Sequence, residues 1–189
     1  NKLGNAGVST LATKLTRNRR ILKLVLYDNG ISRDGAIALF MALRSNNTMN
    51  SLDISQNEIG LPETLEHLKR LLICNSTIEN LFLWNVGIQD HGAIILGEGV
   101  AENEALKRLE LRNNRLSAIG LMALSHGIKV NSTVYKVLLD VPEESDPGKQ
   151  ELALTAYQGI QHHCGQNLVR SGVQEPRSMM SAFSKCGTR

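Results

Sequence analysis

One leucine-rich template recurs along most of this chain and limits its possible folds more than any other feature. The template has the form L-x-x-L-x-L-x-x-N-x-L, and successive copies start 28 or 29 residues apart. Such self-similarity predicts a stack of repeated units. The copies consist of Ile21, Leu24, Leu26, Asn29 and Ile31; Met49, Leu52, Ile54, Asn57 and Ile59; Ile78, Leu81, Leu83, Val86 and Ile88; and Leu106, Leu109, Leu111, Asn114 and Leu116.

The second half of each unit predicts a helix, because apolar residues four positions apart share one helical face. A unit of this length, with one strand and one full helix, resembles the ribonuclease-inhibitor type of leucine-rich repeat. That resemblance implies an α/β solenoid, a horseshoe with parallel strands on its concave face and helices on its convex face. The helical pairs are Leu11 and Leu15, Leu39 and Leu43, Leu96 and Val100, and Leu124 and Ile128.

Asparagines recur at two places in each unit. Those after the strands, such as Asn57, are expected to bond backbone groups of adjacent coils. Val86 cannot do so, and we expect its coil to be looser or to rely on Asn85. Those at the helix ends are expected to close each helix in the left-handed conformation, as C-terminal caps and not as ligands. The helix-end residues are Asn18, Asn46, Asn75, Asn103 and Asn131.

The repeat pattern stops at Pro142, after a last degenerate strand. We therefore expect a solenoid over residues 1–147, with a partial first repeat and about four full repeats. A capping helix is expected over 148–169, with Leu152, Ala156, Tyr157, Ile160, Cys164 and Leu168 on one face, and a disordered tail over 170–189. Because the chain opens inside a repeat, we expect more repeats upstream; without them Leu11 and Leu15 would face solvent.

Composition excludes several functional classes. The net charge is +3 with both signs mixed along the chain, so no nucleic-acid footprint is expected. No apolar run is long enough to span a membrane, and the start does not have the pattern of a signal peptide. Three unpaired-looking cysteines, Cys74, Cys164 and Cys186, favour a reducing, intracellular location, in the cytoplasm or also the nucleus.

The concave face is the expected binding surface. Side chains alternate along a strand, so if Leu24 and Leu26 point inward, Lys23, Val25 and Tyr27 point outward. The same alternation in the other strands brings out aromatic side chains and arginines, the residue types that dominate protein interfaces. The alternative interpretation is that Phe82 and Trp84 only shield the sheet. The expected protein-binding residues are Tyr27, Asp53, Phe82, Trp84, Arg108, Glu110 and Arg112.

Catalytic patterns are weak, and we expect no catalytic residue, no metal and no cofactor. The five histidines are spread over helices and loops, and no Ser, His and Asp set is brought together by the repeat. His162, His163 and Cys164 suggest a metal site at first sight. Adjacent helical residues point in different directions, however, which favours a solvated helix face.

The later part of the chain resembles a particular family, the protein phosphatase 1 regulatory subunit 37 family. The resemblance is carried by Leu111, Arg112 and Asn114, by 120–125 (GLMALS), by 129–132 (KVNS), and by Ile160, Cys164 and 167–169 (NLV). It implies an intracellular, non-enzymatic subunit that binds the protein phosphatase 1 catalytic subunit. The family's docking motif precedes its repeats, and the nearest string here, 136–139 (KVLL), lacks the aromatic residue, so no docking residue is assigned.

Two other functions remain open on the sequence. The repeat length also resembles that of Ran-type GTPase activators. In such proteins an arginine would stabilise the charge that develops during phosphoryl transfer. Arg33 and Arg115 lie in loops from which such a side chain could project, but we prefer the interpretation that they are solvated loop arginines. Other intracellular binding modules of the same repeat class, in innate immunity or at actin filament ends, are the third possibility.

Overall fold

The computed structural model describes residues 1–173, in which helices and three-residue strands alternate. Each unit consists of one strand followed by one helix, as the repeat predicts. The strands are β1 (Lys23–Val25), β2 (Ser51–Asp53), β3 (Asn80–Phe82), β4 (Arg108–Glu110) and β5 (Lys136–Leu138). The helices are α1 (Gly4–Leu15), α2 (Arg33–Leu43), α3 (Pro62–Cys74), α4 (Gln89–Glu102), α5 (Ala118–Val130) and α6 (Pro147–Ser171).

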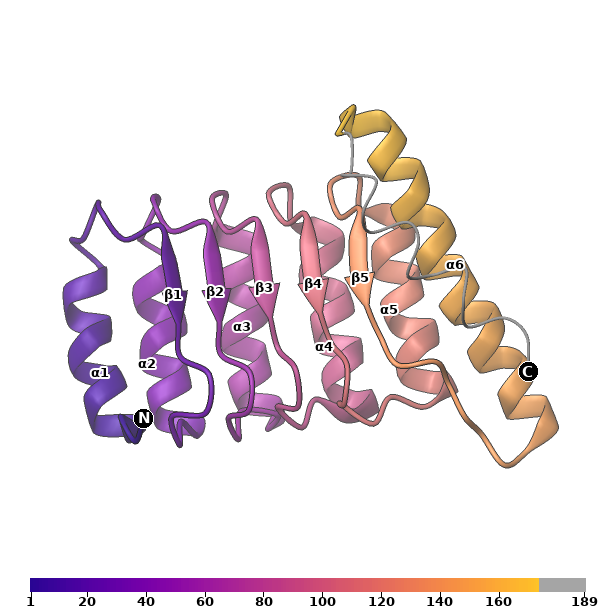
Figure 1. Ribbon diagram of the computed structural model, residues 1–189, viewed down its shortest axis with the longest axis horizontal. Helices are drawn as coiled ribbons and strands as arrows, with labels where there is room; N and C mark the ends of the chain where they lie inside the picture. Colours follow the sequence, from indigo (N-terminus) through magenta and orange to yellow (C-terminus); the bar gives the residue numbers. More distant parts are fainter. Residues whose placement is uncertain (174–189) are drawn as a thin grey trace.

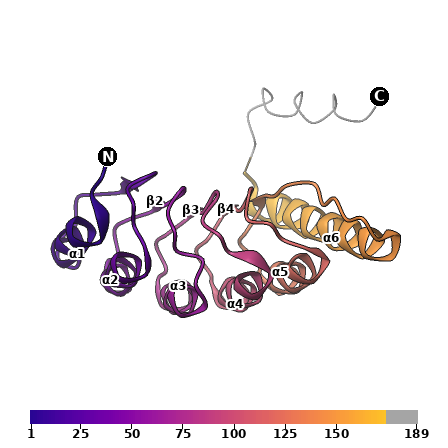
Figure 2. The same ribbon diagram turned by 90° about the horizontal axis from the view of Figure 1, so that it is seen from below.

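All five strands belong to one parallel sheet in sequence order, β1-β2-β3-β4-β5. The template leucines are in register across it, from Leu24 through Leu52, Leu81 and Leu109 to Val137. The strands lie side by side with the helices behind them (Figure 1). Seen from below, the helices form the outer arc and the strands the inner one (Figure 2). This is the leucine-rich-repeat horseshoe that the sequence predicts.

The core lies between the sheet and the helix layer, and the predicted helical stripes line it. Leu39, Leu43 and Leu124 are fully buried, as are template residues such as Leu52. Each buried leucine contributes about 2 kcal/mol of transfer free energy. The expectation that Leu15 faces solvent is wrong: it is buried, because α1 packs along α2.

The asparagines after the strands bond the backbone of adjacent coils, as predicted. The Asn57 Oδ1 atom accepts hydrogen bonds from the amides of Asn29 and Ile31, and its Nδ2 donates to the carbonyls of Leu26 and Ile54. Asn114 makes the equivalent set two coils further along the chain. These side chains pair backbone groups that would otherwise be buried without partners.

The helix-end asparagines also join successive units through a ladder of side-chain hydrogen bonds. They do not close the helices in the left-handed conformation that we expected. Asn75, Asn103 and Asn131 occupy the C-cap positions in extended backbone conformation, not in the left-handed one. The Asn103 Oδ1 atom accepts from the amide of Leu106, and its Nδ2 donates to the carbonyl of Leu72 in the preceding unit. Their role is therefore to link units through hydrogen bonds, for which a left-handed backbone is not required.

The coil that contains Val86 lies close against the preceding coil, although it has no asparagine at this position. Gly60 approaches the following coil so closely that a Cβ atom on it would lie 1.9 Å from the carbonyl oxygen of Gly87. The Asn85 side chain donates to the Gln56 side chain at 3.0 Å. Within residues 1–173, it does not bond backbone groups of the adjacent coil as Asn114 does. Without an asparagine at position 86, the Glu58 amide donates to the carbonyl of Ile31 and the Ile59 amide to that of Asn57.

Helix α6 covers the end of the sheet and packs on α5 and β5 (Figure 1). Asn167 on α6 donates to the carbonyls of Asn131 and Val134, so it continues the helix-end ladder. The expected apolar face is partly wrong, because Leu152 is exposed while Ala153 and Asn167 are buried.

The helix also extends beyond residue 169 to Ser171, and Gly172 closes it in the left-handed conformation. Most of the tail predicted to be disordered lies outside the described residues. Within residues 1–173, no helix has both the length and the apolar content needed to cross a membrane.

Candidate protein-binding surface

A shallow hollow of about 410 Å³ lies on the concave face of the sheet. The short strands expose alternate side chains there, because neighbouring residues point to opposite faces. Six of the seven predicted binding residues line it, and Ser55 is the additional member. The lining consists of Tyr27, Asp53, Ser55, Phe82, Trp84, Glu110 and Arg112.

Tyr27 and Trp84 stack across this hollow. Their ring centroids are 6.1 Å apart and their planes differ by 7°. Ser55 occupies the equivalent position in the intervening coil, and its small side chain leaves room for the two rings to meet. The Ser55 Oγ atom accepts a hydrogen bond from the Trp84 backbone amide at 3.1 Å. Sequence alternation places all three residues on this face, but only the structure shows that the rings touch across a serine.

Glu110 and Arg112 neutralise each other at the side of the hollow formed by β4. The guanidinium donates to both carboxylate oxygens, at 2.9 Å from Nε and 2.6 Å from Nη2. Hydrogen bonding to the Glu110 carboxylate raises the pKa of Arg112. The Glu110 side chain is 7% exposed and that of Arg112 is 51% exposed, so the pair presents mainly the arginine to a ligand.

Asp53 is the remaining charged residue of the hollow. Its Oδ1 atom accepts a hydrogen bond from the Ser55 backbone amide at 3.0 Å. Among the described residues it forms no ion pair. The hollow therefore contains one carboxylate whose charge is not balanced by a neighbour.

The structure does not bring Arg108 into this hollow. Arg108 lies at the start of β4, with its guanidinium carbon 5.8 Å from the ring centroid of Tyr135. A cation over an aromatic face is attracted to the ring quadrupole. Arg108 is thus placed toward β5, away from the cluster around Trp84.

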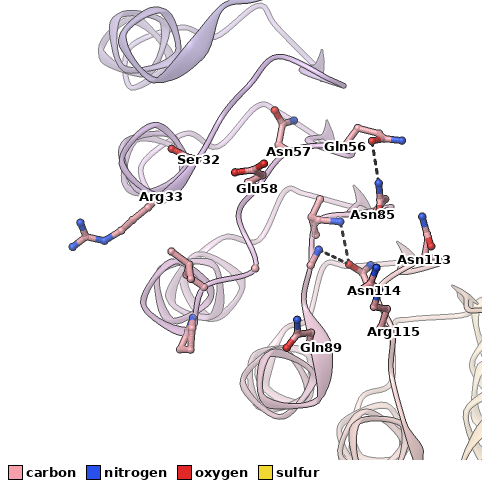
Figure 3. Close-up of a pocket in the computed structure, with 15 residues that line it drawn as sticks. Ser32, Arg33, Gln56, Asn57, Glu58, Asn85, Gln89, Asn113, Asn114 and Arg115 are labelled. Atoms are coloured by element: carbon pink, nitrogen blue, oxygen red, sulfur yellow. Dashed lines mark hydrogen bonds between the residues drawn. The ribbon is translucent and has the colours of Figure 1, made fainter.

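A second, larger hollow of about 750 Å³ lies where the chain passes from the strands into the helices (Figure 3). Both arginines considered for a GTPase activator line it. Arg33 is held by Glu63 through two hydrogen bonds of 2.7 and 2.8 Å, which raise the pKa of Arg33 and lower that of Glu63. Arg115 makes no ion pair among the described residues.

The His162, His163 and Cys164 run on α6 is divided between the surface and the core. No group of three or more His, Cys, Asp or Glu side chains there could hold an ion. The rings of His162 and His163 pack edge to face with centroids 5.5 Å apart, and both side chains contact Gln166. Cys164 faces the core, where burial raises the pKa of its thiol to about 12.

Two segments of the chain match a known family of repeats. Residues 45–62 and 102–125 match the family described as Leucine Rich repeat. Leucine-rich repeat-containing protein 45 of Gallus gallus is 36% identical over 109 residues, which cover 57% of this chain and 16% of that protein. NACHT, LRR and PYD domains-containing protein 3 of Bos taurus is 28% identical over 139 residues, covering 73% of this chain and 14% of that protein.

Among solved structures, the leiomodin-1 actin-binding site 2 superposes with a TM-score of 0.65. It has 15% sequence identity, and the match covers 86% of this chain and 95% of that chain. The chain accordingly has a leucine-rich-repeat fold, and parts of its sequence are similar to leucine-rich-repeat proteins. The chain spans only a small part of the length of these curated relatives.

Proposed function

We propose that the chain binds another protein through its concave face, with the hollow around Trp84 at the centre of the contact. The supporting observation is the stacked pair of Tyr27 and Trp84, which is partly exposed beside polar side chains on an otherwise open sheet. Aromatic residues in such positions supply much of the binding energy in protein interfaces. Their exposure on a free surface is otherwise unfavourable.

We further propose that the partner is the catalytic subunit of protein phosphatase 1 and that this chain acts as a non-enzymatic regulatory subunit without a cofactor, inside the cell. The support is the resemblance of the last repeats and of the closing helix to the subunit 37 family. The part of that resemblance near Arg112 adjoins the hollow, and the part in α6 contains the buried residues Ile160, Cys164 and Asn167.

The test is direct binding of purified phosphatase 1 catalytic subunit to this chain, measured by biolayer interferometry. Trp84→Ala should weaken binding at least tenfold, because interface aromatics contribute about 2 kcal/mol or more. Met122→Ala is the matched control, since Met122 is 50% exposed on α5, in the helix layer. No binding by the wild type rejects these repeats as a contact of the phosphatase. Binding that is equal in wild type and Trp84→Ala rejects this surface.

A Ran-type GTPase activator is the second candidate, favoured by the backbone of Arg115. Its φ angle is +54°, whereas Gly30 and Gly87 occupy the equivalent left-handed position in other coils. A non-glycine residue in this conformation is strained by about 1 kcal/mol or more, and such strain occurs at functional sites. Stimulated GTP hydrolysis by Ran that is lost in Arg115→Ala would support this candidate. Hydrolysis at the unstimulated rate would reject it.

A further inference from the structure

The concave hollow combines two chemical features that both select positive charge. Three of its lining residues, Tyr27, Phe82 and Trp84, are aromatic. The face of an aromatic ring carries negative partial charge and attracts a cation within about 6 Å. Asp53 adds a carboxylate from β2. This strand lies between β1 and β3, which Tyr27 and Trp84 follow in the chain. An anion would satisfy neither feature, and a purely apolar group would leave the Asp53 carboxylate unpaired.

The balance of charge inside the hollow is negative. Glu110 and Arg112 form a bidentate ion pair whose formal charges sum to zero, with the guanidinium as the more exposed partner. One carboxylate oxygen of Asp53 accepts a hydrogen bond from the Ser55 amide. Asp53 forms no ion pair with any cation among the described residues. A positively charged ligand group would therefore complete the site without displacing an existing ion pair.

The surrounding charges restrict how many cations can approach. Lys23 and Arg108 lie at the starts of their strands, two residues before the level of Asp53 and Glu110 in the sheet register. Two residues of strand span about 7 Å, so these cations flank the hollow on one side. They repel a second positive group there. The arrangement consequently favours one basic side chain directed at Asp53.

The hollow is large enough to receive such a side chain. A volume of about 410 Å³ lies at the lower end of the roughly 300–1,000 Å³ range of small-ligand sites. The rings of Tyr27 and Trp84, with centroids 6.1 Å apart, are too close for a third group to enter between them. They provide a platform on which an aliphatic stem can lie.

We propose that this hollow receives a lysine or arginine side chain of the partner protein, with its charged head at Asp53 and its stem against the Tyr27 and Trp84 rings. This inference rests on the proposed function, because it names the chemistry that the concave face recognises. It does not depend on which protein carries the basic residue.

Trp84 is the only tryptophan of the chain, so its fluorescence reports directly on the hollow. We would titrate the full chain with butylguanidinium, and with butylurea as a neutral probe of nearly the same shape. Butylguanidinium should change the emission saturably in the millimolar range, and butylurea should require at least about tenfold higher concentration. Equal affinity for the two probes, or no saturable change with butylguanidinium, would overturn the inference.

Charge-matched variants complete the test. Asp53→Asn should weaken butylguanidinium binding roughly three- to tenfold. Glu104→Gln removes the same charge from an exposed turn between α4 and β4, and it should leave binding unchanged. Equal effects of the two substitutions, or no effect of Asp53→Asn, would contradict a specific role for Asp53.

Binding of the partner to Trp84→Ala separates this inference from the proposed function. If Trp84→Ala loses the partner while the wild-type chain does not discriminate between the two probes, the concave face binds a partner but not through a basic side chain. In that case only the inference fails. If the chain selects butylguanidinium but Trp84→Ala keeps full affinity for the partner, the proposed function fails and the assignment of this hollow to a partner residue fails with it.

Discussion

Replacing Asn114 by alanine should break the coupling between two coils of the solenoid. The Asn114 side chain is buried and its Oδ1 atom accepts hydrogen bonds from the amides of Val86, Gly87 and Ile88 at 3.0 to 3.2 Å. Its Nδ2 donates to the carbonyl of Leu83 at 2.7 Å. Each buried backbone group that loses its partner costs about 1–3 kcal/mol, partly relieved by local relaxation. The expected total is a loss of about 3–5 kcal/mol.

That loss is a large share of the roughly 5–15 kcal/mol by which domains are stable, and it can be measured by urea unfolding at 25 °C. Far-UV circular dichroism would follow the whole solenoid, while Trp84 fluorescence would follow one of the two coils concerned. Asn50→Ala is the control, because the Asn50 side-chain amide makes no hydrogen bond among the described residues and should cost under about 0.5 kcal/mol. A loss below 1 kcal/mol for Asn114→Ala, at unchanged m-value, would refute the reasoning.

Two further predictions concern packing and titration. Gly60→Ala should destabilise the chain by about 3 kcal/mol, because the new Cβ atom would lie 1.9 Å from the Gly87 carbonyl oxygen. Gly165→Ala on α6, where a Cβ atom would have no neighbour within 4 Å, should be neutral or stabilising in the same assay; equal effects would contradict this. Iodoacetamide at pH 8 should label exposed Cys74 and spare buried Cys164, whose thiol pKa is raised to about 12, as peptide mapping can check. Because the Cys164 pKa is higher in the folded state than its ordinary value of 9.0, its contribution to stability is complete below pH 9 and falls between pH 9 and 12. Labelling of Cys164 as fast as Cys74 at pH 8 would contradict its burial.

The fold could be predicted from the sequence because every repeat has the same spacing of apolar residues. Leu24, Leu52 and Leu81 occur at one template position, and a single helix or strand assignment has to fit every copy. Their register in one parallel sheet follows directly from the constant spacing. The coil asparagines could be predicted for the same reason, since a buried bend needs a side chain that pairs its backbone groups.

Features that depend on contacts between different units could not be predicted in this way. The ladder role of Asn103 requires knowing that its side chain reaches the carbonyl of Leu72. Asn167 lies in a helix outside the repeat pattern, so no periodic signal marks it as the continuation of that ladder. Leu152 was expected on the packed face of α6, but the helix is rotated so that Ala153 packs instead.

The sequence predicted which residues lie on the candidate surface, but not which of their side chains contact each other. Strand alternation identified Tyr27, Trp84 and Asp53 as neighbours on one face. The stack across Ser55 and the bidentate bond between Glu110 and Arg112 depend on side-chain rotamers, which no sequence pattern specifies. The departure of Arg108 toward Tyr135 has the same origin.

Site-specific photocrosslinking tests the central claim, binding through the concave face, most directly. A benzophenone amino acid would replace Val25 on β1, which is 54% exposed on the concave side, or Met122 on α5, which is 50% exposed in the helix layer. Both variants would be irradiated with the captured partner and compared by mass spectrometry. The account predicts crosslinks to the partner from position 25 and none from position 122. Crosslinks from position 122 alone, or equally from both positions, would contradict it.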